Sequence, residues 1–227
     1  TVLTSGANGQ DGDITFNDAT NGGLTISANG GGANDFTLTL IAARDIVTTD
    51  TSVNNTGVVF EAVGDDQLNL VFAAGRNITM DGTITTLGGD VRFQEANAAG
   101  AAVVDAAVPG TLTISGNINT TSAAAATAGG VVRLEADGAL TVNNQVTSAG
   151  GNVTLIGSTV TTSANIVASG VAGVAGGAIN IDGSANVVIN NNLTSTGGAG
   201  VGGAGLAGGA VTIDSTGAGN TIVIATG

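Results

Sequence analysis

Hydrophobic positions recur at a fixed step along the chain. An apolar-x-apolar segment is followed six residues later by a second apolar position and six residues after that by a third, as at Leu134, Leu140 and Val146. Each step suits one short strand plus a turn, so three steps return the chain to its starting side. Such a period is typical of repeat architectures. We therefore predict an all-β fold, a right-handed parallel β-helix (solenoid) of about eight coils with Gly/Ala-rich corner loops, as a single domain over residues 1–227.

Three strands are expected in each coil, and we call them A, B and C. The A strands place apolar residues inward and, in all but one, an outward Thr, Arg or Asn between them. The expected A strands are Ile14–Phe16, Leu38–Leu40, Leu70–Phe72, Val91–Phe93, Val132–Leu134, Val153–Leu155, Ile179–Ile181 and Val211–Ile213. The expected B strands run through Leu24, Ile46, Ile78, Leu112, Leu140, Val160, Val187 and Ile222. The segment 58–66 fits this register poorly and is either a coil of its own or a loop.

The residues that lengthen some coils lie mainly between a C strand and the next A strand. They are rich in Gly, Ala and Val, as in the segment 197–210, while a second insertion at 96–110 leaves an A–B corner. Contiguous exposed apolar surface usually marks a contact. We predict lateral packing against neighbouring filaments through Gly197, Val201, Leu206 and Ala210, and flexible decoration is the alternative.

The two ends of the chain carry a further signal. Leu3-Thr4-Ser5 resembles the C strands Val146-Thr147-Ser148 and Leu193-Thr194-Ser195, whereas Ile222-Val223-Ile224 reads as a B strand. Neither end resembles the polar cap that most solenoids need. We predict that one copy completes the last coil of another through Val2, Leu3, Thr4, Ile222, Val223 and Ile224. The alternative is that the chain is one unit of a longer covalent array.

Composition agrees with narrow, stacked strands. Glycine contributes 39 residues and hydrophobic residues reach 42%, while aromatic residues make up only 2%. A helical protein would tolerate this glycine content poorly. The absence of cysteine excludes disulfides and thiolate sites. The net charge of −13 argues against nucleic-acid binding, and no apolar run is long enough for a membrane span, so we expect neither partner.

Two segments resemble a known family. GGVVRLEADGALTVNNQVTSAGGNVTLIGSTV at 129–160 and AAGRNITMDGTITTLGGDVRF at 73–93 are similar to the haemagglutinin-type repeats of large bacterial exoproteins, the filamentous haemagglutinin family of two-partner secretion and related autotransporter passengers. The resemblance covers most of the chain after about residue 68. It implies a right-handed parallel β-helix, export to the cell surface, and a role in adhesion or in building surface fibres.

The residue types present exclude several catalytic mechanisms. Without His, Lys or Cys the chain has no Ser-His triad, Schiff base or histidine metal site. Carboxylate pairs are the remaining candidates for catalysis, namely Asp65 with Asp66, Asp11 with Asp13, and Glu135 with Asp137. The segment 6–14 also approaches a calcium-binding nonapeptide, with Asp11 and Asp13 as candidate ligands, although a glycine-rich turn is the simpler interpretation. We expect no catalytic residues and no cofactor, with calcium as the alternative.

These observations favour a structural role over catalysis. We predict a structural subunit of an extracellular bacterial fibre or biofilm matrix, assembled end to end as a head-to-tail homopolymer with lateral bundling. Secretion to the cell surface and contact with cell-surface glycans follow from the same hypothesis. A stalk segment of a large secreted adhesin is the first alternative, and a secreted polysaccharide-active enzyme is the second.

Overall fold

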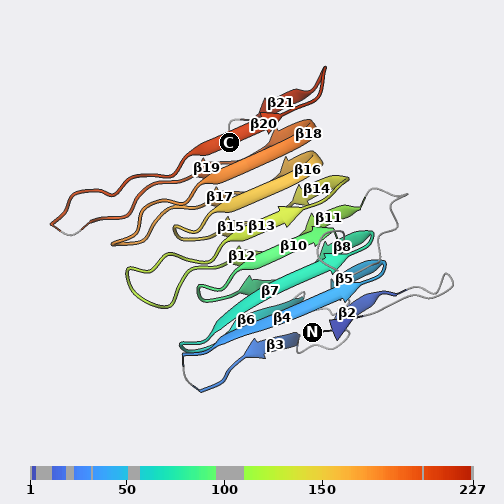
Figure 1. Cartoon of the computed structure of the whole chain (residues 1–227), viewed down its shortest axis with the longest axis horizontal. Helices are drawn as coiled ribbons and strands as arrows, with labels where there is room; N and C mark the ends of the chain where they lie inside the picture. The colour runs from blue at the N-terminus through green and yellow to red at the C-terminus, as the bar shows by residue number, and fades with distance from the viewer. Residues whose placement is uncertain are drawn as a thin grey trace.

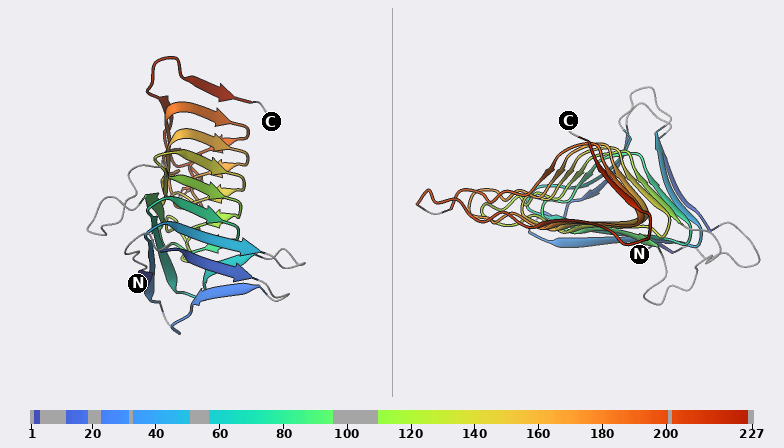
Figure 2. Two further views of the ribbon diagram at one scale, coloured as in Figure 1. Left: turned by 90° about the vertical axis from the view of Figure 1, so that its right-hand side faces the viewer. Right: turned by 90° about the horizontal axis from the view of Figure 1, so that it is seen from above.

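The computed structural model describes residues 2–3, 12–18, 23–31, 33–50, 57–95, 110–200 and 202–225. Within these ranges the secondary structure consists of 21 β-strands and includes no helix. The strands are short and stand one above another in a tall stack, with the two chain ends at opposite ends of it (Figures 1 and 2).

The strands fall into three rows, one on each side of the stack. Row A contains β1 (Val2–Leu3), β4 (Asp35–Ala42), β7 (Gln67–Ala74), β10 (Val91–Glu95), β13 (Val132–Glu135), the first parts of β16 (Val153–Thr162) and β18 (Ile179–Ile189), and β20 (Val211–Ser215). Row B contains β2 (Ile14–Asp18), β5 (Asp45–Asp50), β8 (Asn77–Met80), β11 (Thr111–Ile114), β14 (Ala139–Val142), the second parts of β16 and β18, and β21 (Thr221–Ile224). Row C contains β3 (Leu24–Ala28), β6 (Val58–Ala62), β9 (Ile84–Thr85), β12 (Ile118–Asn119), β15 (Val146–Thr147), β17 (Ile166–Val167) and β19 (Leu193–Thr194).

Neighbouring strands of a row pair in parallel and in register. Val91 of β10, for example, lies between Leu70 of β7 and Val132 of β13. We call one strand from each row a layer, so that layer 1 is β1–β3 and the last layer is β20 with β21. Each layer adds about 4.8 Å to the height of the stack.

The structure corrects the fold class predicted from the sequence, a right-handed parallel β-helix (solenoid) of about eight coils. The described strands form two parallel sheets, one of 14 strands and one of seven, in place of coils with three separate strands each. The reason is that β16 and β18 run from row A into row B without a break, with a register irregularity just after Gly157. The larger sheet therefore covers two sides of the core, and the smaller sheet covers the third.

The predicted rows are wrong in the first layer. Ile14 pairs with Ile46, so β2 belongs to row B and not to row A, and Leu24 pairs with Val58 of row C. The segment 58–66 was predicted as a separate coil or a loop, and its residues 58–62 form the row C strand β6. The alternation of apolar residues is common to all three rows, so it identifies a strand without telling which row the strand joins. From Leu38 onward, the expected A and B strands lie in the predicted rows.

The core consists of the inward residues of all three rows. In β13, Val132 and Leu134 are fully buried while Arg133 between them is partly exposed, as strand alternation requires. Rings fill the lower core: Phe72 stacks on Phe93 with centroids 4.6 Å apart and meets Phe60 edge-on at 5.3 Å. These apolar contacts join successive layers along the axis.

The corner between rows C and A is built from glycines and buried hydroxyls. A Cβ atom on Gly130, Gly151 or Gly177 would come within 2.0–2.2 Å of the carbonyl oxygen of the corner glycine in the layer below, so no side chain fits. Four row C strands are followed by a hydroxyl that donates to the carbonyl of a glycine two residues before a row A strand. These bonds are Thr86 to Gly89 (2.6 Å), Thr120 to Gly130 (2.7 Å), Ser148 to Gly151 (2.5 Å) and Ser195 to Gly177 (2.6 Å).

Candidate functional site

The last layer exposes residues that are buried one layer below. Val211, Ile222 and Ile224 are 46%, 45% and 60% exposed. Their register partners Ile179, Val187 and Ile189 in β18 are each 0% exposed. The sequence places aliphatic residues at both levels, and the difference is that no described strand covers the last layer. The C-terminal end of the stack is therefore an open apolar surface that includes two of the predicted assembly residues, Ile222 and Ile224; the third, Val223, is exposed on the outward face.

Among the described residues, the N-terminal end of the stack is partly uncovered and contains a hollow. Among the described strands, β1 pairs only with Leu40 and Ile41 of β4, so residues 35–39 of β4 have no strand on that side. A hollow of about 270 Å³ lies beside them, lined chiefly by Ile26, Phe36, Leu38 and Leu68. Phe36 is 36% exposed there. Within the described part of the chain, apolar side chains are thus partly exposed at both ends of the stack.

The two ends do not match as predicted from the sequence. Val2 and Leu3 pair with Leu40 and Ile41, so β1 lies in row A, whereas the sequence predicted a row C strand. Row C among the described strands ends at β19, one layer below β20 and β21. If β21 of one copy pairs with β2 of the next, the row C position above β19 stays empty. Thr4, the remaining predicted assembly residue, lies outside the described residues.

A column of alternating charges runs across the first three layers beside row B. The guanidinium of Arg44 donates to both carboxylate oxygens of Asp13 (2.9 and 2.5 Å), and Arg76 does the same to Asp45. Burial acts to raise the pKa of Asp45, but its hydrogen bonds with Arg76 and Asn77 prevail and hold this pKa below its ordinary value. The sequence contains a signal for this column that our sequence analysis missed. Asp13, Asp45 and Asn77 follow one another at intervals of 32 residues. Arg44 and Arg76 directly precede Asp45 and Asn77.

Two of the candidate carboxylates, Asp66 and Glu135, are engaged in structural contacts. Asp66 is buried and accepts the backbone N–H groups of Gly30 (2.5 Å) and Asn34 (3.0 Å), which lower its pKa. Glu135 pairs with Arg133 at 2.7 Å. Asp65 is exposed in the turn before Asp66, and Asp137 is exposed in the turn between β13 and β14. These contacts hold loops and strands in place, and none joins two carboxylates.

The calcium interpretation gains no support from the described residues. Asp13 is occupied by Arg44, and Asp11 lies outside the described part of the chain. In the described ranges no three acidic side chains come together as a metal site would need. Within these ranges there is also no helix long and apolar enough to cross a membrane.

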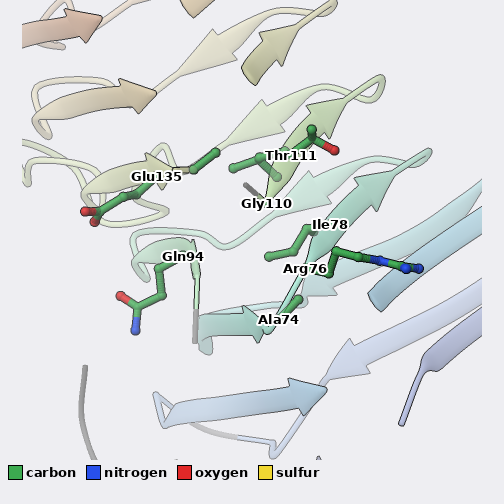
Figure 3. Close-up of a pocket in the computed structure, with 9 residues that line it drawn as sticks. Ala74, Arg76, Ile78, Gln94, Gly110, Thr111 and Glu135 are labelled. Atoms are coloured by element: carbon green, nitrogen blue, oxygen red, sulfur yellow. The ribbon is translucent and has the colours of Figure 1, made fainter. Parts of the chain in front are cut away.

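A small cavity of about 10 Å³ lies beside the end of β10 and the start of β11 (Figure 3). It lies between Ala74 and Ile78 of the lower layer and Ala136 of the upper layer. Gln94 and Glu135 point to one side, and Arg76 points to the other (Figure 3). Space of this size holds about one water molecule, and the polar groups do not converge on it.

The corner loops of the upper layers extend from the stack as a ridge (Figure 2). Backbone hydrogen bonds tie loop to loop, for example from Gly173 N–H to Ala199 O at 2.8 Å and from Gly176 N–H to Ala207 O at 2.9 Å. Of the predicted lateral residues, Leu206 is 37% exposed and Ala210 is exposed. Gly197 is packed against the Leu206 carbonyl inside the loop, and Val201 lies outside the described residues.

Comparison with known proteins gives no match to a family model, to a curated protein or to a solved structure. The resemblance to filamentous haemagglutinin-type exoproteins therefore stays a prediction from the quoted segments. In the ranges that the structure describes, the features that stand out are the exposed apolar side chains at the two ends of the stack.

Proposed function

We propose that this chain is a structural subunit of an extracellular fibre or matrix that assembles end to end. The observation that carries the proposal is the contrast between the exposed Ile222 and Ile224 and the fully buried Val187 and Ile189 beneath them. An open strand edge with apolar residues beside it favours pairing with another chain. A second copy is the simplest partner, because Phe16, Leu24 and Ile26 of its first layer are only partly buried, although Ile14 is buried.

The register of row B gives the joint a specific geometry. In the stack, Ile14 aligns with Ile46, and Ile222 aligns with Val187. If β21 of one copy pairs with β2 of the next in this register, Ile222 lies against Ile14 and Ile224 lies against Phe16. Burying an isoleucine side chain contributes about 1.5–3 kcal/mol. Burial of Ile222 and Ile224, together with backbone hydrogen bonds between β21 and β2, would hold two copies together.

The surroundings of this fibre follow from charge and resemblance. The net charge of −13 argues against nucleic acid as a partner. Cell-surface location, secretion and contact with glycans belong to the proposal through the resemblance to haemagglutinin-type repeats. The exposed Leu206 and Val171 of the corner loops support lateral bundling as a second, weaker contact.

An adhesin stalk is the second candidate function. The open row C edge at β19 favours it, because a covalent neighbour carrying one more row C strand would cover that edge. The ends of such a module would be buried in the whole adhesin. The enzyme alternative has less support, because Asp66, Glu135 and Asp13 are held by structural partners.

Electron microscopy of the purified chain tests the proposal. We expect concentration-dependent filaments with the width of a single stack. Ile224→Asp should abolish them, because a charge would be buried in the joint. Val223→Asp is the matched control: Val223 is the next residue in the same strand but aligns with the partly exposed Val188, so its filaments should persist. Isolated rods at all concentrations, or equal effects of both variants, would contradict the proposal.

A further inference from the structure

Row B carries a regular column of outward threonines in the middle of the stack. Thr79 of β8, Thr113 of β11, Thr141 of β14 and Thr161 of β16 are register partners in four consecutive layers. Each lies between two buried inward residues and is itself half-buried. Neighbouring strands are about 4.8 Å apart, so the four side chains repeat at this distance along the stack. We call these four residues the threonine column.

A second outward column lies two residues earlier in the same strands. It consists of Asn77, Thr111, Ala139 and Thr159. Within it, the Thr111 hydroxyl donates to the Asn77 side chain at 2.8 Å. Residues two apart on a strand share a face and are about 6.6 Å apart. The two columns therefore form a flat net of eight side chains, in which only Ala139 has no polar group.

The hydroxyls of the threonine column are free to bind a ligand. None of the four has a hydrogen-bond partner among the described residues. The hydroxyls of Thr86 and Thr120 at the corner between rows C and A, by contrast, are buried and donate to glycine carbonyls. Threonine is stiff at χ1 because it is branched at Cβ. The net is thus ordered before anything binds to it, which lowers the entropic cost of binding.

No charged side chain interrupts this net. From β8 to β21, the outward residues of the row B strands are Thr, Asn, Ala and Val alone. Row A differs in the same layers, where Arg92, Arg133 and Glu135 point outward. A charged group orients the water around itself and disturbs a regular water lattice. Row B is therefore the better of these two faces for a neutral, periodic ligand.

We propose that the row B net binds the surface of ice. Ice presents water oxygens in regular rows whose repeats are similar in size to those of the net, so many hydroxyls can meet lattice positions at once. Each threonine hydroxyl donates one hydrogen bond and accepts two, and its methyl group fills the space between rows. Weak contacts on one rigid surface reinforce one another. This function goes beyond the proposed fibre and does not rest on it, because one copy contains the whole net.

Ice recrystallisation in the presence of the purified chain tests the proposal. We expect the parent chain to keep ice crystals small. Thr141→Lys should abolish this effect, because a long charged side chain in the threonine column separates the net from the ice. Thr154→Lys is the matched control and should retain the effect, since Thr154 is also half-buried and outward but lies in row A beside Arg133.

A gain of activity provides the second arm of the test. Ala139→Thr completes the second column and should strengthen the inhibition of recrystallisation. Asn180→Thr is its control, because it completes a run of three threonines with Thr154 and Thr212 on row A and should add nothing. Circular dichroism verifies the fold of each variant, and the two threonine variants decide the test if a lysine variant does not fold.

Three results would overturn the proposal. The first is a parent chain that leaves ice growth unchanged. The second is an equal effect of the two lysine variants, which would show that the face does not matter. The third is no gain from Ala139→Thr, or an equal gain from Asn180→Thr. Each of these results leaves the fibre function standing, because filament formation is measured separately by electron microscopy.

Discussion

The two halves of the stack are held together by different means. In the first half, four phenylalanines touch in the core and the Asp13–Arg44–Asp45–Arg76 column ties three layers at the surface. In the second half there is no phenylalanine after Phe93 and no arginine after Arg133. Close-packed corner glycines join the layers there, as Gly151 does on Gly130 and Gly177 does on Gly151.

Strand length explains much of this difference. β4 and β7 of row A have eight residues each, whereas β13 has four. Longer strands enclose a wider section, which needs large side chains to fill it, because voids in a core are costly. A shorter section is filled by Val, Leu and Ile, and its stability depends on how closely the backbones approach at the corner. Width thus determines whether side chains or backbone contacts connect the layers.

The largest effect is expected from removing a ring in the wide half. Phe72→Ala should lower the free energy of unfolding by about 3–5 kcal/mol, because Phe72 is fully buried between Phe60 and Phe93. Stacked repeats contact mainly their neighbours, so hydrogen exchange should accelerate in β4, β7 and β10 far more than in β16 and β18. Phe36→Ala is the matched control and should cost little, since Phe36 is 36% exposed. Uniform acceleration along the whole stack would show that the halves are not separate.

A smaller effect is expected at the corner of the narrow half. Gly151→Ala places a Cβ 2.2 Å from the Gly130 carbonyl oxygen and should destabilise by about 1–3 kcal/mol, measured by urea unfolding. Gly205→Ala is the control, because a Cβ there meets nothing within 4 Å. Its stability should be unchanged or slightly higher. Equal losses for both variants would mean that glycine serves flexibility at this corner and not close packing.

The sequence predicted the strands better than their organisation. From Leu38 onward, the six-residue step located the strands of rows A and B, because inward residues must repeat wherever a strand covers the core. It failed in the first layer, where intervals between strands vary and any row fits the alternation. It also failed to show that β16 and β18 cross from row A to row B. A continuous bent strand and two separate strands place their inward residues at the same spacing.

The candidate site was predicted in part. Exposed Ile222 and Ile224 lie where the sequence placed an assembly end, because their apolar pattern continues to the last described strand. The position of β1 in row A was not predicted, because pairing with Leu40 depends on which neighbouring edge is free and not on the local sequence. The sequence contained no indication of the hollow beside Phe36, because a phenylalanine at a core position and one at the end of a stack occur in the same sequence pattern.

The smallest effect concerns the charge column of the first half and depends on pH. The pKa of Asp45 is lowered from 3.8 in the folded state, so its ion pair contributes stability above about pH 4, and that contribution is lost as the pH falls through the folded-state pKa. Asp45→Asn removes the titration and should cost about 1 kcal/mol or less at pH 7, because Arg76 is partly exposed to solvent and screened. Urea unfolding of both proteins from pH 7 to pH 2 should therefore show the difference shrinking toward acid. Thr159→Val in row B, above the charge column, should leave a pH profile parallel to that of the parent chain. If the difference in unfolding free energy were the same at every pH, Asp45→Asn would act through lost packing and not through lost charge. The two halves of the stack would then differ in their cores alone.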